Sequence, residues 1–175
     1  MLRLILATTL AASYGIYGPA YELGENVPIR SGSEEYLDSE KYQIRRWDRS
    51  APHSIAPLVT KLNQIRRTNP ALQSDLSLHF HHVDNPQILC YSKSAASFDG
   101  APDNVILIAV NLDPFNEQAG WIDLDLKQLG IRHDEYFDVE DLLTGTRYRW
   151  HDRSNYVALR PQTMPGHVFR VTRLV

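Results

Sequence analysis

The chain has 175 residues, of which 43% are hydrophobic and 22% charged, values typical of a globular protein with enough length for one domain and part of a second. Its formal net charge of -3 offers no basic surface, so we expect neither nucleic acid nor a membrane as a partner. A single cysteine, Cys90, excludes an intrachain disulfide. We expect Cys90 to be a buried, unreactive thiol, as fits a reducing, cytoplasmic environment.

The first predicted element covers residues 1–13, MLRLILATTLAAS, a short apolar run with one arginine near its start and small residues at its end. This pattern is typical of a signal peptide. The apolar residues also lie near helical spacing, which is typical of a helix packed on one side. From the residues alone, both interpretations stay open.

A second predicted element, a long loop and a helix follow. Residues 14–23, YGIYGPAYEL, are short and aromatic with two glycines, and they predict a buried strand that runs into a loop. The polar stretch 24–49 is unusually long for a loop within a compact domain, and loops of that length are often functional. Residues 53–67 carry one apolar stripe at helical spacing, which predicts a helix that begins near Ser54 and ends before the Asn-Pro pair at 69–70.

From about residue 75 onward, the pattern changes to short strands separated by turn residues. Apolar and polar residues alternate in most of them, whereas residues 105–110 are a continuous apolar run of strand length. The predicted strands lie around residues 76–80, 88–90, 105–110, 122–126, 136–139, 146–150, 156–159 and 168–171. So many short strands predict an antiparallel β-sandwich.

The elements before residue 74 do not complete a domain by themselves. A buried parallel strand needs cover on both faces, and the flanking helices of this segment cannot supply it alone. We therefore predict an α+β fragment. Residues 1–73 form the C-terminal part of a (β/α)8 barrel, and residues 74–175 form an antiparallel β-sandwich domain.

Two stretches of the sequence resemble a known family. Residues 14–23 resemble the eighth barrel strand of the α-amylase superfamily, with Glu22 at its C-terminal end. Residues 136–145, 148–150, 155–157 and 165–169 resemble that superfamily's C-terminal sandwich. Within the superfamily, GSEEYLDSEKY at 32–42 resembles the loop after the eighth strand in α-1,4-glucan:maltose-1-phosphate maltosyltransferases. Residues 1–13 resemble the seventh barrel helix of those enzymes, which favours a helix over a signal peptide.

The resemblance implies a retaining glycosyltransferase of glycogen and α-glucan biosynthesis. Such an enzyme transfers maltosyl units from α-maltose 1-phosphate to the non-reducing end of α-1,4-glucans and releases phosphate. The chemistry uses two carboxyl groups, one as nucleophile and one as acid/base. In the family they come from barrel strands four and five, and a stabilising aspartate follows strand seven, so all three would precede residue 1. We expect no catalytic residue and no activity in this chain alone, no cofactor, and a homodimer in the longer enzyme.

The loop at 24–49 carries the candidate substrate-binding residues. Active sites of barrels lie among the loops at the C-terminal ends of the strands. By resemblance, Lys41 and Tyr42 align with residues that contact the maltosyl donor. An ammonium group donates to sugar hydroxyls, and a tyrosine offers a hydroxyl and an apolar ring face. Alternatively, Glu40 and Lys41 form a solvated charge pair and Tyr42 packs the loop. Glu22 and Glu40 are candidates for supporting the site.

Other polar and aromatic residues have simpler interpretations. His79, His81 and His82 have no acidic or cysteine partner at a metal-ligand spacing, so we predict a solvated strand face and no metal. Trp121 and Trp150 either hold a glucan chain or pack the sheet. A non-catalytic glucan-binding module is therefore one alternative function. Another is a fragment of a trehalose-forming enzyme or an α-glucan hydrolase, and the loop at 32–42 favours the maltosyltransferase over it.

Overall fold

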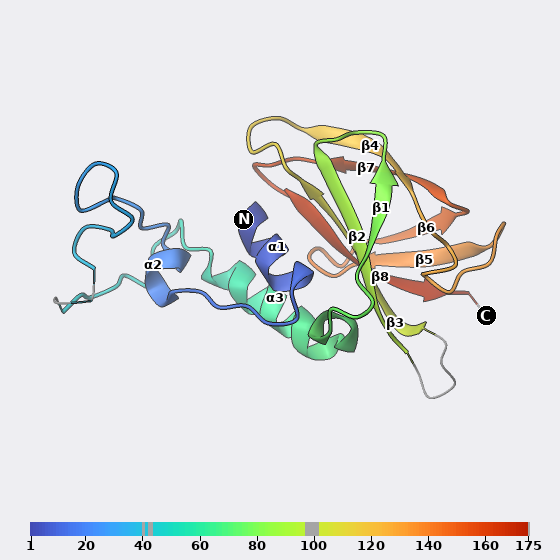
Figure 1. Cartoon of the computed structure of the whole chain (residues 1–175), viewed down its shortest axis with the longest axis horizontal. Helices are drawn as coiled ribbons and strands as arrows, with labels where there is room; N and C mark the ends of the chain where they lie inside the picture. Colours follow the sequence, from blue (N-terminus) through green and yellow to red (C-terminus); the bar gives the residue numbers. More distant parts are fainter. Residues whose placement is uncertain (40, 42–43, 97–101, 175) are drawn as a thin grey trace. The chain divides into compact units, whose positions relative to one another are not determined.

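The computed structural model describes residues 1–39, 41, 44–96 and 102–174 (Figure 1). The chain divides into two compact units, one made of Met1–Tyr14 with Lys61–Val175 and the other of Gly15–Thr60. The helices are α1 (Leu2–Leu10), α2 (Gly18–Glu22), α3 (Ala56–Thr68) and the short 3-10 helix η1 (Pro70–Gln73). The strands are β1 (His79–Val83), β2 (Ile88–Ala96), β3 (Pro102–Asn111), β4 (Gln118–Asp123), β5 (Tyr136–Asp141), β6 (Arg147–His151), β7 (Ser154–Leu159) and β8 (Gly166–Arg173).

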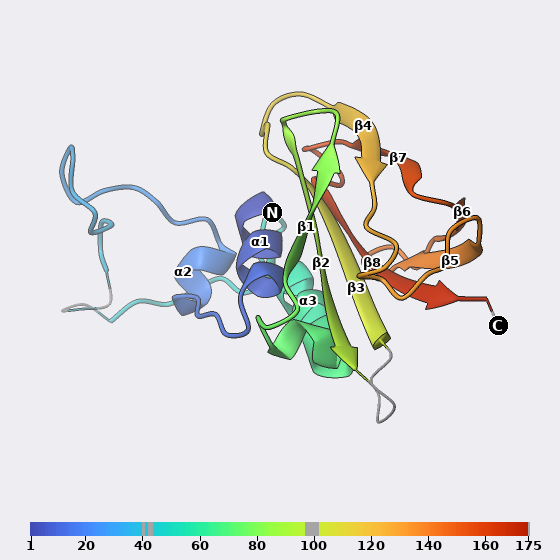
Figure 2. The same cartoon turned by 45° about the vertical axis from the view of Figure 1, so that its right-hand side comes forward.

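The strands form one antiparallel sheet in the order β6-β5-β8-β3-β2-β1-β4-β7. The predicted antiparallel β structure is therefore confirmed. β6 and β7 stand at opposite ends of this order, yet only Asp152 and Arg153 separate them in the chain, so the sheet curls into a barrel-like form (Figure 2). β1 turns the corner, because His79–His81 pair with β2 whereas His82 and Val83 pair with β4.

The interior of the curled sheet is one apolar core. Inward side chains alternate with outward ones along the strands, as the sequence pattern predicts. The core includes Ile88, Cys90, Val105, Leu107, Ala109, Ile122, Leu124, Phe137, Val139, Trp150, Val157, Leu159, Phe169 and Val171. Burial raises the pKa of the Cys90 thiol far above its usual range, so the thiolate that would react is disfavoured.

β3 is buried on both faces. Val105, Leu107 and Ala109 belong to the core, whereas Ile106 and Ile108 point outward and are also fully buried. The outward face is covered by α1 and η1, both of which contact β3. The continuous apolar run at 105–110 is explained by this double burial.

Polar contacts fix α1 on the sheet. The Thr9 hydroxyl donates to the Ile5 carbonyl oxygen at 2.6 Å, so the Tyr91 hydroxyl, also 2.6 Å away, donates to Thr9. From α3, the Arg66 guanidinium donates to the carbonyl oxygens of Thr8, Ala11 (3.1 Å) and Ala12 (2.5 Å). Arg66 thereby satisfies carbonyls that the end of a helix leaves without partners.

The predicted helices are present, with shifted bounds. A helix is expected at 1–13, and α1 lies within that range. The helix expected at 53–67 is α3, which begins two residues after Ser54. The Ser54 hydroxyl oxygen accepts the Ala56 N–H at 3.3 Å, so Ser54 still stabilises the helix start. None of the described helices is long and apolar enough to cross a membrane.

The strand predicted at 14–23 is wrong for this structure. Gly18–Glu22 form α2, in which the Leu23 N–H donates to the Pro19 carbonyl oxygen at 2.9 Å. A strand needs a neighbour for its backbone hydrogen bonds, and none of the described strands pairs with this segment. Pro19, in the first turn, needs no N–H partner there, so a short helix satisfies the backbone locally.

The two units differ in burial, and hydrogen exchange should report this difference. Leu4, Ile5 and Leu62 are almost fully buried, whereas Ala20 and Val59 are the only buried residues among those described in 15–60. We expect amides in α1 and in residues 61–68 to exchange slowly and those in 15–54 to exchange within the shortest labelling times. Mass spectrometry after deuterium labelling checks this pattern, and equally slow exchange in both units would contradict it.

Candidate functional site

The predicted substrate-binding residues lie in the unit Gly15–Thr60. Glu22 ends α2, and its carbonyl oxygen accepts the Ile55 N–H at 2.8 Å. Lys41 is exposed in the loop. Glu40 and Tyr42 lie outside the described residues. The roles of these four residues stay predictions.

Arg45 holds the loop around Lys41. Its Nη2 lies 3.1 Å from the Glu25 carboxylate, and its Nη1 donates to the Leu37 carbonyl oxygen at 3.2 Å. The guanidinium also lies over the Trp47 ring, 4.3 Å from the ring centre. One side chain thus joins the beginning, middle and end of the loop and fixes both sides of the segment that carries Lys41.

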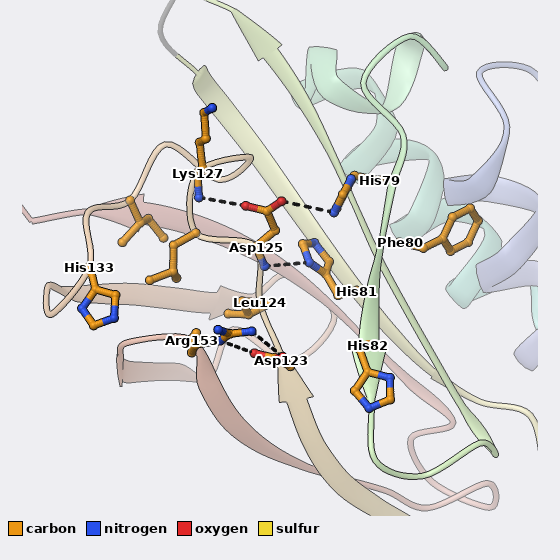
Figure 3. A pocket seen from close by; sticks show the side chains of 12 residues that line it. His79, Phe80, His81, His82, Asp123, Leu124, Asp125, Lys127, His133 and Arg153 are labelled. Atoms are coloured by element: carbon orange, nitrogen blue, oxygen red, sulfur yellow. Dashed lines mark hydrogen bonds and ion pairs between the residues drawn. The ribbon is translucent and has the colours of Figure 1, made fainter.

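A polar hollow of about 490 Å³ lies in the other unit, where β1 turns from β2 to β4 (Figure 3). Its lining combines polar side chains with an apolar floor. The lining residues are His79, Phe80, His81, His82, Asp123, Leu124, Asp125, Leu126, Lys127, Ile131, His133 and Arg153. The three histidines of β1 are therefore part of a concave surface and not a flat solvated face.

His81 corrects the predicted solvated strand face most clearly, because it is only 7% exposed. The Asp125 N–H donates to its Nδ1 at 3.2 Å. Nδ1 is thus an acceptor, so Nε2 carries the proton and donates to the Ser92 hydroxyl oxygen at 2.9 Å. Burial, and next the neighbouring His79, lower the pKa of His81 to about 4. His81 is a neutral structural link between β1, β2 and the segment after β4.

The carboxylate of Asp125 organises the rim of the hollow. One oxygen accepts the N–H groups of Lys127 (3.1 Å) and Gln128 (3.3 Å), and the other lies 3.7 Å from His79 Nε2. These contacts stabilise the turn after β4. An aspartate commonly stabilises a turn in this way, because its side chain accepts a hydrogen bond from the backbone N–H two residues later.

Asp123 and Arg153 form a two-point ion pair beside Asp125 (Figure 3). Arg153 Nε and Nη2 lie 2.5 and 2.6 Å from the two carboxylate oxygens. The hydrogen bond from Arg153 lowers the pKa of Asp123. A glycoside-cleaving acid needs a raised pKa instead. The pair therefore suits fixed recognition of a ligand better than proton transfer.

Two aromatic rings stand next to this pair on β4 and β7. Trp121 pairs with Tyr156 across the strands, and their ring centres lie 5.4 Å apart. Both side chains are about half exposed, at 50% and 53%. Trp150, in contrast, is 9% exposed and packs edge-on against Phe137 and Phe169. The glucan-holding interpretation is wrong for Trp150, and sheet packing is confirmed there.

A histidine and two aspartates lie close together where the segment before β5 meets the turn before β7. His133, Asp134 and Asp152 bring their ligand atoms within 4.8 Å of one another. His133 and Asp134 are exposed, and exposed groups of this kind are common without an ion. Asp134 (φ 67°) and Asp152 (φ 53°) adopt the left-handed backbone conformation that aspartates tolerate in turns. We therefore assign these residues to turns.

The family comparison covers nearly the whole sheet. A family model described as "GLGE, C-terminal" matches residues 80–171, from β1 to β8 and more than half of the chain. The chain belongs to the GLGE C-terminal family. The hollow, the Asp123–Arg153 pair and the Trp121–Tyr156 pair all fall within the matched residues of this GLGE C-terminal chain or at their edge.

Similar proteins extend the comparison to nearly the full chain. The GLGE C-terminal chain is 50% identical to α-1,4-glucan:maltose-1-phosphate maltosyltransferase 2 of Streptomyces coelicolor, over 98% of this chain and 25% of the relative. It is 46% identical to the maltosyltransferase of Chlorobaculum tepidum, over 98% of this chain and 26% of that one. The chain thus spans about a quarter of the length of the curated relatives it matches.

Solved structures support the fold alone. The α-amylase of Geobacillus thermoleovorans superposes with a TM-score of 0.60 at 17% identity, over 99% of this chain and 33% of that chain. The maltogenic α-amylase AmyB of Thermotoga neapolitana superposes with a TM-score of 0.61 at 13% identity, over 100% and 36%. The GLGE C-terminal chain shares the antiparallel, barrel-like sheet found in those amylases.

His81 should make the stability of the GLGE C-terminal chain depend on pH. Its folded pKa of about 4 lies below the ordinary 6.5, so between these values the unfolded chain binds a proton that the folded chain does not. The free energy of unfolding should therefore fall as the pH falls through this window, by roughly 3 kcal/mol from this residue.

Urea unfolding at about pH 7 and about pH 4.5 measures this effect. His81→Gln removes the titrating group, so the variant should lose less stability between the two conditions than the unchanged chain does. His133→Gln is the matched control, because the His133 side chain is 78% exposed. Equal losses in the His81→Gln variant and in the unchanged chain would contradict the assignment.

Proposed function

We propose that this chain is the C-terminal part of a retaining maltosyltransferase that transfers maltosyl units from α-maltose 1-phosphate to the non-reducing end of α-1,4-glucans and releases phosphate. The observation that carries the proposal is the 50% identity, over 98% of this chain, to two Streptomyces coelicolor maltosyltransferases. The trehalose-forming or hydrolytic alternative is less supported, because the α-amylases with the same fold are only 13–17% identical.

Within such an enzyme, residues 1–73 contribute to the catalytic barrel and residues 74–175 form the C-terminal β domain. In this division, α1 and α3 act as the seventh and eighth barrel helices. The unit Gly15–Thr60 exposes many apolar side chains, which further barrel elements would cover. They include Tyr17, Val27, Ile29, Leu37 and Ile44, which are 46–101% exposed.

Lys41 and Tyr42 contact the maltosyl donor in this proposal, and Glu22 and Glu40 support the site. The donor carries a phosphate, so the ammonium group of Lys41 suits it by charge. Arg45 supports the assignment, because it fixes both ends of the segment around Lys41. The nucleophile and the acid/base belong to the remainder of the barrel. The enzyme works in the cytoplasm as a homodimer, without a cofactor.

A chimeric enzyme tests the function. The quarter of the Streptomyces coelicolor maltosyltransferase 2 that matches this chain is replaced by these 175 residues. We expect the chimera to release phosphate from α-maltose 1-phosphate when maltohexaose is the acceptor. The relative without its matching quarter, and this chain alone, should release none. A chimera that folds like the relative, judged by circular dichroism and gel filtration, but releases no phosphate would sink the proposal.

The donor contact of Lys41 is tested in the same chimera. Lys41→Met should raise the KM for α-maltose 1-phosphate by roughly tenfold or more, since a lost hydrogen bond to a charged group costs about 1.5–3 kcal/mol. Lys41→Arg should recover part of the loss by restoring the charge. Lys61→Met is the matched control, because Lys61 is an exposed lysine on α3. An unchanged KM in Lys41→Met would rule out the contact.

A further inference from the structure

The outward surface of β4 and β7 carries an exposed aromatic face, which we define by Trp121, Tyr156, Asp123 and Arg153. Trp121 and Asp123 lie two residues apart on β4 and so point to the same side. Their cross-strand partners are Tyr156 and Ser154. The neighbouring Ile122 and Val157 are buried in the core, which places Trp121, Asp123 and Tyr156 on the outer side. Arg153 precedes β7 and joins them through its ion pair with Asp123.

At one end of the aromatic face, the two rings adjoin small side chains. The next outward pair along the strands is Ala119 and Ala158. Their methyl groups are small, and Trp121 and Tyr156 are 50% and 53% exposed beside them. The two rings meet edge to face, so the surface of the pair that faces away from this contact is open to a ligand. Single exposed aromatic residues are ordinary, but two large rings in contact on an open strand pair are a surface suited to a ligand.

Hydrogen-bonding groups lie at the other end of the face. Asp123 and Arg153 hold one another in a fixed two-point pair. An arginine has five N–H donors, and this pair uses two of them. The Asp123 oxygens likewise keep lone pairs beyond these two bonds. The charges of Asp123 and Arg153 cancel, so the face favours a neutral, hydroxyl-rich ligand over an anionic or cationic one.

We propose that the aromatic face binds an α-1,4-glucan chain. A glucose ring presents apolar C–H groups on its faces and hydroxyls around its edge, which match an aromatic ring beside a fixed Asp–Arg pair. The planes of Trp121 and Tyr156 meet at 60°, so successive sugar rings on them must be tilted. A curved α-1,4-linked chain fits this tilt better than a flat β-1,4-linked chain. The choice of glucan rests on the proposed function.

The hollow extends the same surface. Asp123 and Arg153 belong to the lining of the hollow as well as to the aromatic face. His82, opposite Asp123 on β1, also lines it and is exposed (Figure 3). A glucan with rings on Trp121 and Tyr156 therefore continues past the Asp123–Arg153 pair toward His82, where further polar groups face its hydroxyls.

Titration calorimetry with the full 175-residue chain and maltohexaose tests the aromatic face. We expect a dissociation constant of about 1 mM or below, and a loss of affinity of about tenfold or more in Trp121→Ala and in Tyr156→Ala. Tyr136→Ala is the matched control, because Tyr136 is an exposed aromatic residue (55%) on β5. It should bind as the unchanged chain does. Cellohexaose, the β-1,4-linked hexasaccharide, should bind at least tenfold more weakly.

Several outcomes would overturn the inference. The first is no heat of binding with maltohexaose at millimolar concentration. The second is that Trp121→Ala and Tyr136→Ala bind maltohexaose with equal affinity. The third is that the unchanged chain binds cellohexaose as tightly as maltohexaose. A change of oligomeric state in Trp121→Ala, seen by gel filtration, would assign the face to a protein interface instead. Circular dichroism confirms that each variant is folded. Phosphate release by the chimera is measured separately, so an active chimera with unaffected glucan binding in Trp121→Ala overturns this inference and leaves the proposed function standing.

Discussion

The outward side chains of β3 must be kept from water, and that requirement determines which surfaces of the sheet are covered and which are open. Ile106 and Ile108 are fully buried although they point away from the core. α1 and η1 supply the cover, and the hydrogen bond between Tyr91 and Thr9 fixes α1 in place. The covered side of the sheet is therefore centred on β2 and β3, whereas Trp121 and Tyr156, on the outward side of β4 and β7, stay about half exposed.

The helices that cover the sheet also bury several polar side chains, and each of these side chains needs a hydrogen-bond or ion-pair partner. Lys93, on β2, is fully buried, and its ammonium group reaches the Asp75 carboxylate at 2.7 Å. The Asn69 amide donates to the Ile65 carbonyl oxygen at 2.7 Å and joins the end of α3 to the sheet through Asn104. A buried amide or ammonium without a partner costs several kcal/mol, so these contacts select one docked position of the helices.

Local patterns predict much of this fold. Apolar and polar residues alternate along β5 and β7, where one face of the strand is buried, and apolar residues are continuous in β3, where both faces are buried. The apolar stripe at 53–67 predicts α3. Residues 14–23 are the informative failure, because their strand-like composition needs a neighbouring strand that the described chain does not provide. The β-strand propensity is a property of the segment alone, whereas a strand forms only where another strand of the fold can pair with it.

The site residues that sequence reasoning missed are joined by contacts between distant positions. Arg153 meets Asp123 thirty residues earlier, and Asp125 meets His81 forty-four residues earlier. Neither spacing has a local signature, because the pairs form only after β4 takes its place beside β1 and β7. The solvated face predicted for His81 was wrong for the same reason, since the strand bend and the Asp125 N–H bury and satisfy the ring.

Trp121 and Trp150 have opposite roles for the same reason, the alternation of side chains along a strand. Trp150 lies opposite Phe137 and Trp121 lies opposite Tyr156. Phe137 is fully buried, whereas Tyr156 is half exposed. Because side chains alternate with a period of two, a shift of one residue in either strand would exchange core for surface. Strand register, set by the burial of residues such as Ile122 and Val157, therefore decides that Trp121 is available for a ligand and Trp150 for the core.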